Sequence, residues 1–367
     1  MPKNLSYINI GITRLKFLIK IFKQTATKVI LFILLCLFIA SLFYYWTWWE
    51  RQFNKVWGFY YVSKGDKAYK LTKYQDAVDY YKKALEYYPG HSRAGCNLGN
   101  IYVTFENYNE AVNSYRKALE YSPNYNVCRM DLGIILAEKL ADFDGAIREY
   151  RKVVNSKPLQ IHIPMVYNSK DSTKTNKGRA YYNMGLAYKG KAMYLGEGTE
   201  NYYQNLRYAR EAYRAAKEIL PTDYDILYNL ALTNHLLGDF KNAGIEYCNA
   251  IQTAPYEFEA HFNLALLLRT LNMNKESLGE FEKTGMLLDN SGDINKNKYI
   301  YGVLNEVKHG LISKGEYDYL VKRTDITAHD DSELAYKNGV VDLSKTKNND
   351  FTKILKECPY KKTFEEM

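Results

Sequence analysis

Proline is scarce in this sequence, with 8 residues among 367, so few positions interrupt a helix. Tyrosine is abundant, at 36 residues, and 47% of the chain is hydrophobic while 25% is charged. This composition excludes disorder along the whole chain. It indicates a folded, mainly helical protein in which tyrosine occupies systematic positions.

Acidic residues are absent from the first 49 positions, which carry six basic residues: Lys3, Arg14, Lys16, Lys20, Lys23 and Lys28. The chain has 50 Lys+Arg and 41 Asp+Glu, so positions 50 to 367 hold 44 basic residues against 41 acidic ones and a charge of only +3. Because this body is nearly neutral, we expect no nucleic-acid partner, since such binding depends on positive charge.

Charge of either sign is absent from residues 29–49, VILFILLCLFIASLFYYWTWW. A helix of this length spans roughly 31 Å, about one bilayer core, so we predict a transmembrane helix. Tyr and Trp gather at its end, as in membrane interfaces, and no small-x-small signal cleavage site follows it. The preceding basic residues predict a cytoplasmic N-terminus and an extracytoplasmic, periplasmic body. Lipid contact is expected through residues 1–49. Residues 1–28 form either an amphipathic interfacial arm or an unstructured topology signal.

Motifs for enzymatic or metal chemistry are missing. The 6 histidines form no HExxH motif and no pair at helical ligand spacing, and the 5 cysteines form no CxxC motif. No GxSxG, Walker or paired-carboxylate pattern occurs. We therefore expect no catalytic residues, no metal and no cofactor. A disulfide between Cys96 and Cys128 is left open.

An internal repeat of 34 residues dominates the rest of the chain. The segment YQDAVDYYKKALEYYPG, Tyr74 to Gly90, returns as YNEAVNSYRKALEYSPN, Tyr108 to Asn124. Six copies share an Ala, an aromatic residue and a Pro, the last copy being eroded: Ala77, Tyr81, Pro89; Ala111, Tyr115, Pro123; Ala146, Tyr150, Pro158; Ala209, Tyr213, Pro221; Ala243, Tyr247, Pro255; Ser277, Phe281, Asp289. A small residue precedes each set: Gly65, Gly99, Gly133, Gly185, Ala231, Ala265.

Each repeat predicts a pair of antiparallel helices. The small residues allow the two helices to approach closely, the aromatic residue fills space between hairpins, and Pro ends the second helix. The motifs NLGNIY (Asn97 to Tyr102), NMGLAY (Asn183 to Tyr188) and YNLALTN (Tyr228 to Asn234) resemble the first helix of tetratricopeptide repeats (TPR). The resemblance covers about residues 58–291. It implies an all-α superhelical solenoid of about six repeats with a capping helix, behind one transmembrane helix.

Interruptions in the repeat pattern set the predicted boundaries. We predict the following segments: 1–28 as basic arm, 29–49 as transmembrane helix, 50–57 as juxtamembrane, 58–158 as repeats 1–3, 159–177 as linker, 178–291 as repeats 4–6, 292–312 as capping helix and 313–367 as polar tail. About twelve extra residues separate the helices of the fourth repeat, and the third has one extra residue near Ala141.

The concave face of such a solenoid is lined by first helices, and the resemblance implies that it holds peptides or partner helices. Two residues before the small position of four repeats stands an asparagine, whose amide suits a peptide backbone: Asn97, Asn183, Asn229 and Asn263. The residues just before the last three, Tyr182, Tyr228 and Phe262, are expected to add apolar contacts. We expect these amides to face solvent, while the alternative is that they are consensus packing residues. The Lys, Asn and Arg set of a carboxylate clamp is absent.

The sequence therefore predicts a bacterial-type inner-membrane scaffold that binds other proteins or peptide segments in envelope assembly or secretion. Two alternatives stay open. One is a cytosol-facing receptor on a membrane, and the other is a self-associating structural protein, a homo-oligomer.

Overall fold

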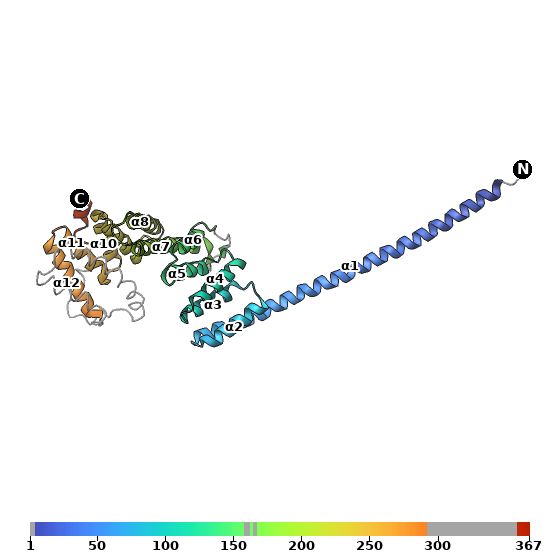
Figure 1. Cartoon of the computed structure of the whole chain (residues 1–367), viewed down its shortest axis with the longest axis horizontal. Helices are drawn as coiled ribbons and strands as arrows, with labels where there is room; N and C mark the ends of the chain where they lie inside the picture. The colour runs from blue at the N-terminus through green and yellow to red at the C-terminus, as the bar shows by residue number, and fades with distance from the viewer. Residues whose placement is uncertain (1–3, 158–161, 164–166, 292–357) are drawn as a thin grey trace. The chain divides into compact units, whose positions relative to one another are not determined.

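The computed structural model describes the backbone of residues 4–157, 162–163, 167–291 and 358–367, with side chains at 25, 27–157, 173–287 and 358–367. The predicted capping helix 292–312 and the tail up to residue 357 lie outside the described residues. The chain divides into two compact units, Met1–Ile101 and Tyr102–Met367. Apart from one two-residue strand pair, the described elements are helices, as Figure 1 shows, so the predicted all-α fold is confirmed.

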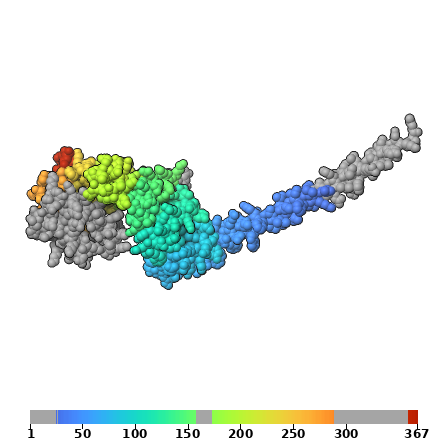
Figure 2. Space-filling view, in the orientation of Figure 1, coloured from blue at the N-terminus to red at the C-terminus, as the bar shows by residue number. Residues whose placement is uncertain are grey.

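The first unit begins with one continuous helix, α1 (Asn4–Lys70). Residues 50–57, predicted as a separate juxtamembrane segment, are part of this helix. Its apolar stretch has a mean hydropathy of 2.5 and is long and apolar enough to cross a membrane. Figure 2 shows the blue, described part of α1 as a narrow rod of single-helix width. The last three turns of α1 supply the first helix of repeat 1.

The second helix of repeat 1, α2 (Tyr74–Tyr87), packs against the end of α1. A Cβ atom on Gly65 would lie 2.6 Å from Cε1 of Tyr81, so only glycine admits the tyrosine ring there. Gly58 meets Tyr88 in the same way. The contact between Gly65 and Tyr81 explains the small residue of the sequence pattern, because this residue leaves room for the repeated aromatic ring of the same repeat. The unit ends within α3 (Ser92–Thr104).

The second unit carries the later repeats. Its helices are α4 (Tyr108–Tyr121), α5 (Asn126–Glu138), α6 (Phe143–Val154), α7 (Ser169–Leu195), α8 (Glu200–Ile219), α9 (Tyr224–Leu236), α10 (Phe240–Thr253), α11 (Phe258–Thr270), α12 (Asn274–Ser291) and α16 (Lys361–Glu366). The ring of Tyr213 on α8 lies on Gly185 of α7, where a Cβ would be 2.4 Å from Cε1. The Tyr213 ring also packs on Leu230 of the next hairpin, so this tyrosine joins its own repeat to the neighbouring repeat.

Both interruptions of the repeat pattern have a structural form. In the predicted linker, β1 (His162–Ile163) pairs antiparallel with β2 (Tyr167–Asn168), and α7 begins directly afterwards at Ser169. The extra residues of the fourth repeat lengthen its helices, since α7 has 27 residues and α8 has 20. In the third repeat the extra residue lengthens the turn, and Ala141 takes a left-handed φ of 52°.

The end of the chain is held to repeat 5, which the sequence did not predict. Cys358 forms a disulfide with Cys248 of α10, 110 positions away, and Phe364 is fully buried against Gly244. The last ten residues of the segment predicted as a polar tail, 358–367, therefore pack on α10. The disulfide between Cys96 and Cys128 that the sequence left open is not formed, and both side chains are buried. A pairing across 110 positions has no local signal in the sequence.

A buried histidine gives the fold an acid-sensitive position. His235 of α9 is 5% exposed, and burial lowers its pKa to about 4. Below pH ~6.5 the imidazole binds a proton in the unfolded chain but stays neutral in the folded chain. The contribution of His235 to the free energy of unfolding is therefore complete above this pH. It falls by up to about 3 kcal/mol as the pH is lowered towards 4. Urea unfolding of the wild type and His235→Leu across this range should show that the variant lacks this loss. Parallel losses in both proteins would place the titration elsewhere.

Candidate peptide-binding site

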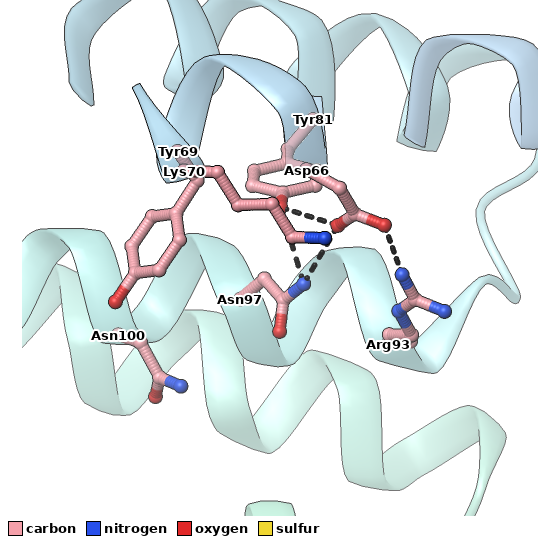
Figure 3. A pocket seen from close by; sticks show the side chains of 7 residues that line it. All are labelled: Asp66, Tyr69, Lys70, Tyr81, Arg93, Asn97 and Asn100. Carbon is pink, nitrogen blue, oxygen red and sulfur yellow. Dashed lines mark hydrogen bonds and ion pairs between the residues drawn. The ribbon is translucent and has the colours of Figure 1, made fainter. Parts of the chain in front are cut away.

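A hollow of about 210 Å³ opens on the first unit between the first helices of repeats 1 and 2. Figure 3 shows the side chains that line it: Asp66, Tyr69, Lys70, Tyr81, Arg93, Asn97 and Asn100. Three come from the last turns of α1, three from α3, and Tyr81 reaches in from α2. The glycine at position 65 makes this possible, because it lets the Tyr81 ring cross α1 to the hollow.

Asp66 is the centre of a hydrogen-bond network in the hollow. Its Oδ1 accepts from Tyr81 Oη at 2.7 Å and from Asn97 Nδ2 at 3.2 Å, and its Oδ2 forms an ion pair with Arg93. Asn97 Nδ2 also donates to Tyr81 Oη, at 3.1 Å. Burial and the hydrogen bond to Asp66 raise the pKa of Tyr81 well above its ordinary value, so this phenol remains protonated. The network fixes the amide and the guanidinium relative to α1.

The charges around the hollow favour an anionic group. Lys70 is exposed at the rim, and the Arg93 side chain is 56% exposed although Asp66 pairs with it. Two cations therefore face one carboxylate, and Asn97, whose Nδ2 donates to Asp66 and Tyr81, leaves its amide oxygen beside them. Tyr69, 40% exposed, adds an aromatic wall. Such a surface suits an extended peptide that carries a carboxylate.

The predicted asparagines fall into different environments. Asn97 lies in the hollow, and Asn183 on α7 is half-buried. Asn229 and Asn263 are 7% and 0% exposed, so the expectation that these amides face solvent is wrong for both. The sequence pattern places all four at the same helix position. It does not specify how deeply each is covered.

Asn229 and Asn263 use their amide hydrogens within the chain. Asn263 Nδ2 donates to Tyr228 Oη at 2.9 Å and to the Glu259 carbonyl at 3.0 Å. Asn229 Nδ2 donates to the Asp225 carbonyl at 2.8 Å and to Tyr182 Oη at 3.4 Å. Each asparagine thus reaches the tyrosine of the preceding first helix. Tyrosine and asparagine join successive repeats of the second unit.

The apolar candidates of the same face are also largely internal. Phe262 is fully buried and packs edge-on against Phe281, with ring centroids 5.7 Å apart. Tyr228 is 6% exposed and stacks on Tyr224. Tyr182 is half-buried and contacts Tyr213. In the part of the chain that the structure describes, these three contribute mainly to packing.

Sequence reasoning missed Asp66, Lys70 and Arg93 as functional candidates. The available signal was the spacing of Arg93 and Asn97, which are four residues apart and therefore share one face of α3. Within the described residues, no group of three or more His, Cys, Asp or Glu side chains is placed to hold a metal ion.

Comparison with known proteins identifies the repeats. A family model of the tetratricopeptide repeat matches residues 60–91 and 93–125, and a second matches residues 204–258. No relative was matched among curated proteins.

Several solved structures are similar. PilF of Pseudomonas aeruginosa is 15% identical over 63% of this chain and 91% of that chain, with a TM-score of 0.47. PilW, described as a type IV pilus biogenesis factor, is 14% identical over 67% and 98%, with a TM-score of 0.46. MamA of Desulfovibrio magneticus RS-1 is 19% identical over 53% and 94%, with a TM-score of 0.42. The family models, together with the helix hairpins at the matched residues, show that this chain contains tetratricopeptide repeats.

Proposed function

We propose that this chain is a membrane-anchored adaptor that holds an extended, carboxylate-bearing segment of another protein at the hollow between repeats 1 and 2. The observation that carries the proposal is the lining of the hollow, in which the two cations Lys70 and Arg93 stand beside the single carboxylate of Asp66. A peptide carboxylate entering there exchanges its hydration for charge-assisted hydrogen bonds. Two asparagines of the second unit, Asn229 and Asn263, serve mainly to link repeats.

The same proposal places the anchor in a bacterial inner membrane and the repeats outside the cytoplasm. The six basic residues before position 29 favour a cytoplasmic N-terminus. The Cys248–Cys358 disulfide supports an extracytoplasmic location for the repeats, because disulfides persist in oxidising compartments. A role in assembling or exporting envelope proteins follows from this location. The alternative of a cytosol-facing receptor requires the opposite orientation and a reduced Cys248.

The binding site is tested by fluorescence anisotropy with the detergent-purified full chain. The probe is a labelled pool of ten-residue peptides containing Asp and Glu, and its control is the matched pool with Asn and Gln. The acidic pool should bind more tightly, and Lys70→Ala should weaken it about tenfold, equivalent to ~1.4 kcal/mol. Lys73→Ala, which removes an exposed lysine outside the hollow, should change little. Equal affinity of both variants for the acidic pool would refute the site.

A further inference from the structure

The membrane-proximal part of α1 carries an apolar stripe that the rest of the described chain leaves largely exposed. It consists of Trp46, Trp49, Phe53, Val56 and Tyr60, which are 72%, 55%, 62%, 64% and 45% exposed. The spacing alternates between three and four residues, the pattern of positions a and d in a coiled coil. Three of the five residues lie beyond the uncharged run that ends at Trp49.

The first repeat occupies the opposite face of the same helix. Gly58 and Gly65, which receive Tyr88 and Tyr81 of α2, stand seven residues apart. With Trp46, Phe53 and Tyr60 at position a, both glycines fall at position f, on the side of the helix away from a and d. The α2 hairpin therefore leaves the stripe open from Trp46 to Val56, while at its end Lys64 lies over both Tyr60 and Tyr80 of α2.

A bilayer that α1 spans cannot cover the far end of this stripe. The interfacial layer adds about 5–8 Å to each side of the hydrocarbon core. Val56 and Tyr60 lie roughly 10 and 16 Å beyond Trp49 along the axis, and a typical tilt of about 20° shortens these heights only slightly. Laying the stripe on the membrane surface requires a bend, but α1 is one continuous helix from Asn4 to Lys70. Val56 and Tyr60 therefore lie beyond the bilayer and need a packing partner, whereas Trp46 and Trp49 belong to the predicted span 29–49.

One charged side chain of this described segment reaches the end of the stripe, since Nζ of Lys64 lies 4.8 Å from the centroid of the Tyr60 ring. Glu50 and Lys64 fall at position e, Arg51 at f and Lys55 at c, so none interrupts the a and d positions. When two copies lie parallel, the residue at position g of one helix lies near a residue at position e of the partner, and this e residue is five positions later in the sequence. These pairs are Tyr45 with Glu50, Gln52 with Trp57 and Phe59 with Lys64, so no like charges meet.

We propose that two copies of this chain pack in parallel along the stripe, from the membrane through Tyr60. The inference rests on the proposed membrane span, because insertion in one direction holds both helices parallel and sets identical residues at equal depth. Each a and d residue then faces its own counterpart, as a two-fold interface requires. The dimer holds two peptide-binding hollows close together on its paired transmembrane helices, so a partner with two acidic segments gains avidity.

Cysteine crosslinking in native membranes tests the seam with the full chain. In a Cys36→Ala background, Phe53→Cys and Val56→Cys are compared with Arg51→Cys and Lys55→Cys, which lie at similar depth but off the seam. Disulfides require Cβ atoms about 4 Å apart, so oxidation should give about tenfold more crosslinked dimer at the two seam positions. The native Cys248–Cys358 pair is common to all four proteins.

Alkaline carbonate extraction of the same membranes separates the failure of the anchor from the failure of the dimer. If carbonate releases the chain, both the anchor and the seam are wrong. If the chain resists extraction but crosslinks equally at all four positions, or at none, the anchor stands and the dimer is overturned. As a second measurement, mass photometry of the detergent-purified chain should show dimers for Lys55→Glu and monomers for Val56→Glu. Dimers of both variants would also overturn the proposal.

Discussion

Replacing Tyr213 with Ala is expected to lower the free energy of unfolding by about 3–5 kcal/mol, the usual cost of removing a large buried aromatic side chain. Tyr213 is fully buried between Gly185 of its own repeat and Leu230 of the next. Glycine at 185 cannot move into the space left by the ring, so a cavity remains. Urea unfolding followed by circular dichroism measures the loss. Because repeats couple mainly to neighbours, hydrogen exchange should accelerate first in α7 to α9.

The matched control is Tyr121→Ala. Tyr121 ends α4 in the same unit and is 58% exposed, so its removal should change stability by no more than about 0.5 kcal/mol. A Tyr213→Ala protein as stable as the control would show that the repeat tyrosine does not hold the hairpins together. The same comparison distinguishes a general effect of losing tyrosine from an effect of its position.

Removing the Cys248–Cys358 disulfide is expected to cost up to about 4–5 kcal/mol in the stability of repeat 5 and the chain end. The reason lies in the unfolded state, because a bridge across 110 positions closes a long loop and lowers the entropy of the unfolded chain. Cys358→Ala therefore lowers the urea midpoint, and it exposes the Phe364 site on α10 to hydrogen exchange. Reductant should have the same effect on the wild type.

Two controls isolate the bridge. Reductant should leave the Cys358→Ala protein unchanged, since its remaining described cysteines are not paired with each other. Cys96→Ala should leave the sensitivity of the wild type to reductant intact. If reductant destabilises Cys358→Ala as much as the wild type, the bridge contributes nothing and another thiol is responsible. A negative result would also remove the support that the disulfide gives to an extracytoplasmic location.

The membrane orientation and the binding site depend on different parts of the chain, so they fail separately. The charge bias before position 29 concerns orientation, whereas the hollow between repeats 1 and 2 depends on side chains of α1, α2 and α3. A reporter active only outside the cytoplasm, fused after Met367, addresses the first. Peptide binding by Lys70→Ala addresses the second. The dimer seam on α1 requires neither Lys70 nor Arg93.

The sequence by itself determined the repeat fold, because the information for a helix hairpin is local. A small residue such as Gly185 and an aromatic residue such as Tyr213 recur with a period that fixes which helix faces meet. The apolar run 29–49 was equally legible, since its length and lack of charge need no knowledge of the rest of the chain.

Only the tertiary structure decided which polar groups meet. Asn97 and Asn263 occupy equivalent repeat positions, yet one lines a hollow with Asp66 and Arg93, and the other is buried against Tyr228. Their surroundings come from side chains about one repeat away, whose depth the period does not encode. The same reason applies to Cys248 and Cys358, which the fold joins across 110 positions. Helix pairing depends on short-range spacing, whereas burial, charge pairing and disulfides depend on what the packed repeats bring together.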